Sequence, residues 1–128
     1  MAPIKKLLLA VATLSTIFVM PPDAEAGCAT RKAKGYSLIL SVQEKSPVDY
    51  GLVTECGHNA GAFQAFKGEK MDFGWAKCLN NCEEGFIPTN LYVRVGKTFK
   101  PGSIERPDRG KTCMQQFRSA TMYCLETL

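Results

Sequence analysis

Six cysteines constrain the possible folds of this chain more than any other feature of its sequence. They lie at Cys28, Cys56, Cys78, Cys82, Cys113 and Cys124. An even number of cysteines in a short chain that leaves the reducing cytoplasm is typical of a disulfide framework. A chain of this length has only a small hydrophobic core, so such bridges contribute a large share of its stability. We therefore predict a small domain with three disulfides.

The N-terminus has the layout of a secretory signal. Two lysines precede an apolar run over residues 7–20, and the small-x-small pattern that signal peptidase recognises ends at Ala26. The run is shorter than the roughly 20 residues that a helix needs to cross a bilayer, and no later stretch is long or apolar enough to do so. We predict a signal peptide over residues 1–26 and one secreted, cysteine-rich domain over residues 27–128.

Alternation of apolar and polar residues predicts four strands in this domain, over residues 36–42, 50–56, 62–66 and 91–95. We expect the first two strands to form a hairpin.

Two further segments show apolar residues at helical spacing, and we predict helices over residues 73–84 and 112–125. Prolines and glycines interrupt residues 99–111, which predicts a loop there. Strands and helices that do not alternate regularly favour the α+β class. We expect a single-domain antiparallel sheet packed with two short helices and stabilised by three disulfides.

The pairing of the cysteines stays open, because six cysteines allow fifteen connectivities. Cys78 and Cys82 are four residues apart on a predicted helix, so they point the same way and favour two different partners. Cys28 lies near the start of the mature chain. We expect it to pair with Cys113 or Cys124, a bridge that would close a loop of most of the domain.

The cysteines also raise the alternative of a metal site. Cys56, Cys78, Cys82 and His58 are soft ligands of the kind that zinc prefers. Their spacing differs from the common C-x2-C pattern, and exported thiols tend to oxidise. We therefore favour disulfides and predict neither a metal nor another cofactor.

A catalytic site is the second alternative. His58 is the single histidine of the chain. Together with Glu55 and Arg94 it would supply an acid–base set suited to RNA cleavage. No recognisable catalytic motif fixes these partners, and no nucleophile elbow, zinc-protease helix or phosphate-binding loop is present in the sequence. We predict that the protein is not an enzyme, with ribonuclease-like activity as the alternative.

The basic residues suggest a binding surface. The net charge is +4, which favours weak attraction to acidic surfaces. Residues 97–111 concentrate this charge in five basic residues, which we predict as a binding loop: Lys97, Lys100, Arg106, Arg109 and Lys111. The expected partner is a host protein or an acidic cell-surface component. We do not expect nucleic acid, a membrane-spanning segment or an oligomer.

A signal with a cleavage site at Ala26, six cysteines after it, a basic net charge and no catalytic motif form a pattern that resembles the small secreted cysteine-rich effectors of plant-associated fungi. The resemblance covers the layout of the whole chain. It implies an extracellular or host-delivered protein that binds a host component and modulates host defence.

Two alternatives to the effector function stay open. The same layout is similar to secreted antimicrobial proteins and killer toxins, for which residues 97–111 would contact the target. The third reading is a secreted ribonuclease-like protein in which His58 acts as an acid or base.

Overall fold

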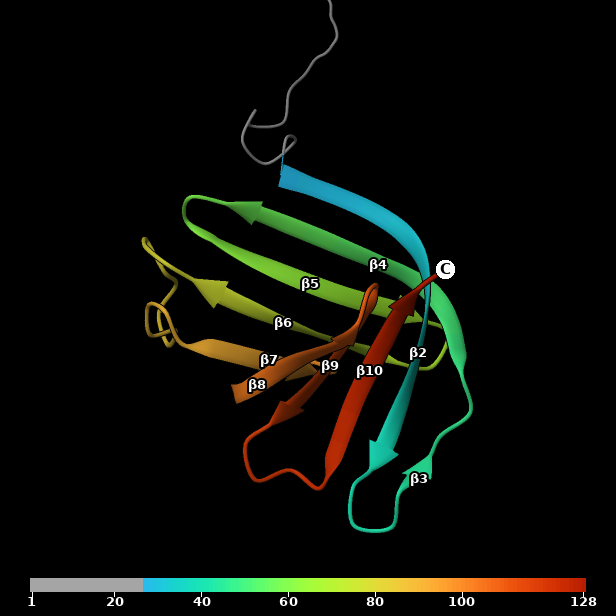
Figure 1. Cartoon of the computed structure of the whole chain (residues 1–128). Coiled ribbons are helices and arrows are strands. Elements are labelled where there is room, and N and C mark those ends of the chain that lie inside the picture. Colours follow the sequence, from blue (N-terminus) through green and yellow to red (C-terminus); the bar gives the residue numbers. More distant parts are fainter. Residues whose placement is uncertain (1–26) are drawn as a thin grey trace, which may run out of the picture.

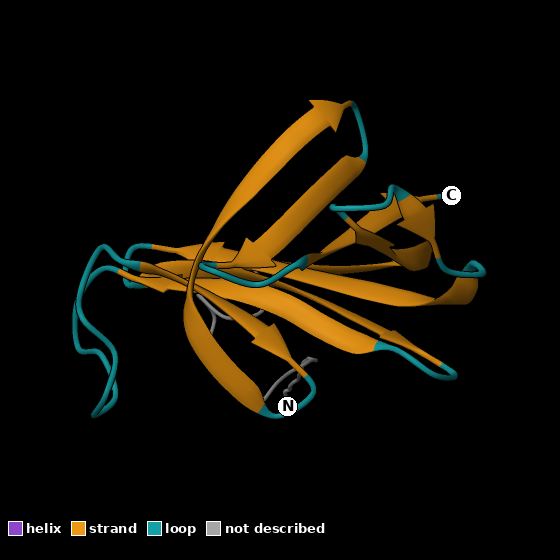
Figure 2. Ribbon diagram, turned by 90° about the horizontal axis from the view of Figure 1, so that it is seen from below, coloured by secondary structure: helices purple, strands orange, loops and turns teal. Residues whose placement is uncertain are grey.

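The structure is a computed structural model that describes residues 27–128. The predicted signal peptide over residues 1–26 lies outside the described residues. Within residues 27–128 the regular elements are all strands (Figures 1 and 2). They are β2 (Cys28–Ile39), β3 (Glu44–Lys45), β4 (Asp49–His58), β5 (Gly61–Gly68), β6 (Asp72–Cys78), β7 (Leu91–Val95), β8 (Thr98–Asp108), β9 (Lys111–Gln116) and β10 (Thr121–Thr127).

Eight of these strands form a closed antiparallel β-barrel. Each strand from β4 to β9 pairs with the next along the chain, β4 pairs with β2, and β10 pairs with β2 to close the ring. The short β3 pairs only with the end of β2. The predicted α+β fold with two short helices is therefore wrong, and the three disulfides are confirmed.

Two long strands turn the corners of the barrel. β2 pairs with β4 through residues 28–35 and with β10 through residues 33–39, and Figure 1 shows how it curves between them. β8 pairs with β7 through residues 98–101 and with β9 through residues 102–108. Glycine suits such corners because a bent strand brings neighbouring backbone and side chains close. A Cβ on Gly102 would lie 2.3 Å from the carbonyl oxygen of Gln115.

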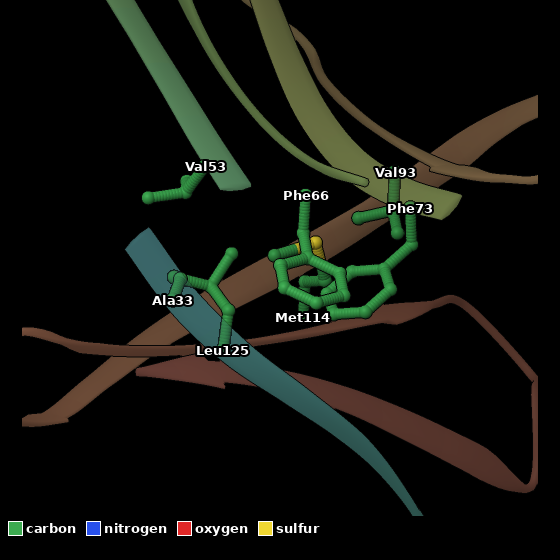
Figure 3. Close-up of a cluster of buried hydrophobic side chains, with 7 residues drawn as sticks. All are labelled: Ala33, Val53, Phe66, Phe73, Val93, Met114 and Leu125. Carbon is green, nitrogen blue, oxygen red and sulfur yellow. The ribbon is translucent and has the colours of Figure 1, made fainter. Parts of the chain in front are cut away.

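The core fills the inside of the barrel. Seven of the eight barrel strands each contribute one fully buried residue to a single cluster: Ala33, Val53, Phe66, Phe73, Val93, Met114 and Leu125 (Figure 3). The rings of Phe66 and Phe73 pack with their centroids 5.2 Å apart. Because side chains occupy this space, the described cluster is a packed core of the kind found in small barrels.

The predicted helix over residues 73–84 is wrong. The spacing of its apolar residues and cysteines fits a helix, but the segment forms a strand followed by an irregular connection. Residues 73–78 form β6, in which Phe73 and Trp75 face the core with the two-residue period of a strand. The remaining residues form an irregular connection to β7.

The predicted helix over residues 112–125 is replaced by the β9–β10 hairpin. In that hairpin Cys113 and Cys124 lie directly opposite each other and form a disulfide. Eleven helical residues would separate their Cα atoms by roughly 16 Å, too far for a bridge. Cysteines at this separation therefore fit a hairpin and exclude a helix.

The strand predictions are largely confirmed. β7 matches residues 91–95, and β4 and β5 include the predicted residues 50–56 and 62–66. The predicted hairpin between residues 36–42 and 50–56 is wrong: β4 pairs with residues 28–35 of β2, and residues 36–39 pair with β10. The predicted loop over residues 99–111 is wrong, because most of it forms β8; its proline and glycine at positions 101 and 102 lie at the corner of a bent strand.

The expected disulfide between Cys28 and the C-terminal segment is also wrong. Cys28 pairs with Cys56 across β2 and β4, and Cys78 pairs with Cys82 rather than with two separate partners. All six cysteines are bridged. Three disulfides are compatible with an extracellular protein.

Candidate functional site

A groove of about 830 Å³ lies on the outer face of the barrel wall, across β5, β6 and the segments beside them. Directly paired residues of neighbouring strands point to the same face of a sheet. Phe66 pairs with Phe73, and both face the core. Ala65 pairs with Gly74, one position away, so this second pair faces outward.

The floor of the groove consists of small residues. Ala65, Gly74 and Ala76 lie together on the outer face of β5 and β6, and all three line the groove. Because their side chains are short, the outer surface of the sheet is recessed at this position. The groove therefore lies directly over the backbone of β5 and β6, and the core lies on the opposite face of the same strands.

Aromatic rings rise around this floor. Phe63 on β5 and Phe99 on β8 both line the groove, and 39% and 42% of these residues are exposed. Phe86 joins them from the connection between β6 and β7. Its ring packs edge-on against Tyr92 at 4.9 Å and Phe99 at 5.2 Å between centroids. Three phenylalanines thus present apolar surface to one site.

The connection over residues 79–90, here called the 79–90 loop, joins β6 to β7 (Figure 1). It forms one wall of the groove. The Cys78–Cys82 disulfide holds its first residues in a tight turn. The backbone N–H of Thr89 donates to the carbonyl oxygen of Cys78 at 2.8 Å, and that of Ile87 donates to the hydroxyl of Tyr92 at 2.9 Å. These contacts fix Phe86 in place against the barrel.

Arg94 is the main charged group at the groove floor. It lies directly opposite Gly74, and only 19% of its side chain is exposed. Its Nη1 donates to Oδ1 of Asp72 at 2.7 Å and to the carbonyl oxygen of Gly96 at 2.6 Å. The hydrogen bond from Arg94 lowers the pKa of Asp72, and Lys67, at 3.4 Å, adds to the effect. Asp72 is therefore ionised at neutral pH.

The five basic residues predicted as one binding loop do not share one surface. Lys97 lies in the turn before β8, and Arg109 lies in the turn after it. These turns lie at opposite ends of β8, whose first part pairs with β7 and whose second part pairs with β9. The segment is a strand with basic residues along it, and binding to acidic partners stays a prediction.

Two of these basic residues have specific partners. The guanidinium of Arg106 lies 5.7 Å from the centroid of the Trp75 ring. The Nζ of Lys111 lies 3.9 Å from Glu126, and the Tyr36 hydroxyl, with a smaller effect from Glu126, raises the pKa of Lys111. Lys100 is exposed within β8.

The residues of the catalytic hypothesis are divided between the two faces of the wall. His58 and Arg94 both line the groove. Glu55 pairs with Gln64 on the inner face, where it accepts a hydrogen bond from the Gln64 amide at 2.5 Å. The Nδ1 of His58 accepts a hydrogen bond from the backbone N–H of Ala60 at 3.0 Å. The structure therefore does not gather the three side chains into one site.

The four proposed metal ligands are also separated by their bonding, since Cys56, Cys78 and Cys82 are oxidised in two different disulfides. Within residues 27–128 no group of three or more metal-ligating side chains lies together.

Sequence reasoning missed the groove itself. Its floor comes from alanines and a glycine, which carry no chemical signature, and its wall comes from a segment predicted as a helix. One signal was present: Phe63, Ala65 and Ala76 alternate with core residues, so a strand over residues 73–78 would have placed small residues beside aromatic ones on one outer face.

No family model, curated protein or solved structure matches this chain. In the part of the chain that the structure describes, no helix has the length and apolar character needed to cross a membrane.

Proposed function

We propose that the protein is a secreted binding protein that holds a small apolar ligand in the outer groove. The observation that carries the proposal is the arrangement of Phe63, Phe86 and Phe99 around a floor of alanine and glycine. Ligand pockets typically occupy about 300 to 1,000 Å³ and combine apolar walls with a few polar groups. The groove has this size and this composition.

The proposal assigns no catalytic step to the protein. The apolar walls offer surface for burial, and each Å² of apolar surface removed from water contributes about 25 cal/mol. A ligand that covers the three rings would gain binding energy without any chemical change.

The test is a fluorescence titration with N-phenyl-1-naphthylamine, a neutral apolar dye that becomes bright when it leaves water. We expect saturable binding at one site. The double variant Ala65→Leu/Ala76→Leu raises the floor of the groove and should weaken binding by at least about tenfold, the loss that corresponds to 1.4 kcal/mol. Thr30→Leu places a leucine at an exposed position of β2 outside the groove and serves as the control.

The proposal fails if the dye does not bind in a saturable way, or if the double variant and the control bind it equally well. Far-ultraviolet circular dichroism shows whether each variant keeps the strand content of the wild type.

We propose host colonisation as the setting of this binding, as the resemblance to secreted cysteine-rich effectors implies. The six cysteines and the basic net charge support this proposal. Its test is transcript abundance in the source organism during growth on a living host and in pure culture. Strong induction on the host is expected; flat expression would favour an antimicrobial protein, which growth inhibition of competing microbes would reveal.

A further inference from the structure

Arg94 has hydrogen-bond donors that the protein leaves free. A guanidinium carries five N–H groups, two of them on Nη1. Both hydrogen bonds that Arg94 makes to described residues leave from Nη1, one to Asp72 and one to Gly96. Among residues 27–128, neither its Nε nor its Nη2 donates a hydrogen bond to the protein. Three N–H groups of a largely buried cation are thus available at the groove.

The charges around Arg94 leave an excess of positive charge. Asp72 is the carboxylate that pairs with Arg94, and it also pairs with Lys67 at 3.4 Å. One negative charge therefore faces two positive charges at this end of the groove. Two other charged residues line the groove, Lys77 and Glu83, and their charges offset each other.

These observations extend the proposed function, on which they rest. We propose that the ligand of the groove is an apolar organic acid, whose hydrocarbon or ring system lies on the small-residue floor among the phenylalanines and whose anionic group is bound by Arg94. The fork of Nε and Nη2 matches the two oxygens of a carboxylate. An aromatic acid and a fatty acid share this chemistry.

A matched pair of dyes separates the two parts of the proposal. 8-Anilinonaphthalene-1-sulfonate has the same ring system as N-phenyl-1-naphthylamine and carries one additional anionic group. We expect the wild-type protein to bind the anionic dye about tenfold more tightly, as hydrogen bonds to a charged group allow. Equal binding of the two dyes would overturn the inference and leave the proposed function intact, whereas no binding of either dye would overturn both.

Variants of the ion pair give the residue-level test. Arg94→Gln should reduce affinity for the anionic dye to that of the neutral dye and leave the neutral dye unchanged within about twofold. Arg94→Lys, which keeps the charge and loses the fork, should restore part of the preference. Arg109→Gln removes one positive charge from a turn outside the groove and should preserve the preference.

Asp72→Asn keeps the test decisive if Arg94→Gln fails to fold. It removes the negative charge that partly neutralises Arg94, so affinity for the anionic dye should rise while affinity for the neutral dye stays the same. If affinity for the anionic dye falls or stays constant in a folded Asp72→Asn protein, Arg94 is not the anion-binding group. Titration of decanoate and of an aromatic carboxylate against bound anionic dye then distinguishes the two ligand sources.

Discussion

Gly35 lies directly against the ring of Phe66: a Cβ atom on Gly35 would be 2.7 Å from Cε2 of that ring. Gly35 occupies the part of β2 that pairs with both β4 and β10, and Phe66 belongs to the core. At this point in the closure of the barrel the strand carries no side chain, and a phenylalanine ring of the core takes the space.

Gly35→Ala should destabilise the protein, because the added methyl group forces the Phe66 ring or β2 to move. Overpacking of this kind costs about 1 to 3 kcal/mol. Urea unfolding measures the change. Gly57→Ala is the matched control, since a Cβ at Gly57 would meet nothing within 4 Å. Equal stability of the Gly35 and Gly57 variants would show that the Phe66 ring and β2 can move apart at little cost in free energy.

The three disulfides should stabilise the protein in the order of the lengths of the loops that they close. In the chain-entropy model, replacing both cysteines by serine should cost about 3.5 kcal/mol for Cys28–Cys56, about 3 for Cys113–Cys124 and about 2 for Cys78–Cys82. Their sequence separations are 28, 11 and 4 residues. Thermal unfolding of the three double variants measures the order, and non-reduced peptide mapping checks each pairing.

The disulfide with the smallest effect on stability should have the largest effect on ligand binding. Cys78–Cys82 holds the 79–90 loop, which carries Phe86 to the groove. Cys78→Ser/Cys82→Ser should weaken dye binding and speed amide hydrogen exchange in that loop. Cys113→Ser/Cys124→Ser should lower stability more and leave dye binding unchanged. The reverse pattern would show that the 79–90 loop does not contribute to ligand binding.

Asp49 should make the protein sensitive to acid. Its buried carboxylate accepts backbone hydrogen bonds from Lys70 at 2.9 Å, Met71 at 2.8 Å and Glu69 at 3.2 Å. These bonds lower its pKa below the ordinary value of 3.8. A lowered pKa contributes stability that is present above the ordinary value and is lost as the pH falls through the folded-state pKa.

Asp49→Asn should therefore be less stable than the wild type at pH 7, and its stability should change less between pH 5 and pH 2, a window chosen around the ordinary carboxylate pKa. Thermal unfolding across this range is the measurement. Parallel curves for the two proteins would show that other carboxylates account for the acid sensitivity.

The sequence predicts the strands better than the architecture. Alternation locates β5, whose buried side chains Gln64 and Phe66 share one face, and β7, whose apolar residues Leu91, Val93 and Val95 share one face. It fails for β9 and β10, where Cys113 and Cys124 are buried on the face opposite to Met114 and Leu125. With apolar residues on both faces, the alternation disappears, and helical spacing occurs by chance.

The strand β8 was missed for a different reason. Pro101 and Gly102 usually interrupt a strand, and here they lie where β8 passes from β7 to β9. Proline and glycine suit both a corner of a barrel and a loop, because in both places the backbone bends and lies close to neighbouring segments. Local sequence cannot distinguish the two, since the difference lies in long-range pairing.

Residue-specific nuclear magnetic resonance tests the central claim most directly, because it locates the ligand. We would titrate the 15N-labelled protein with N-phenyl-1-naphthylamine and follow the backbone amides. The account predicts saturable shifts concentrated at Ala65, Gly74, Ala76 and the 79–90 loop, with little change at the core residues Val53 and Leu125. Shifts centred on the inner face, or spread over the barrel without saturation, would contradict it.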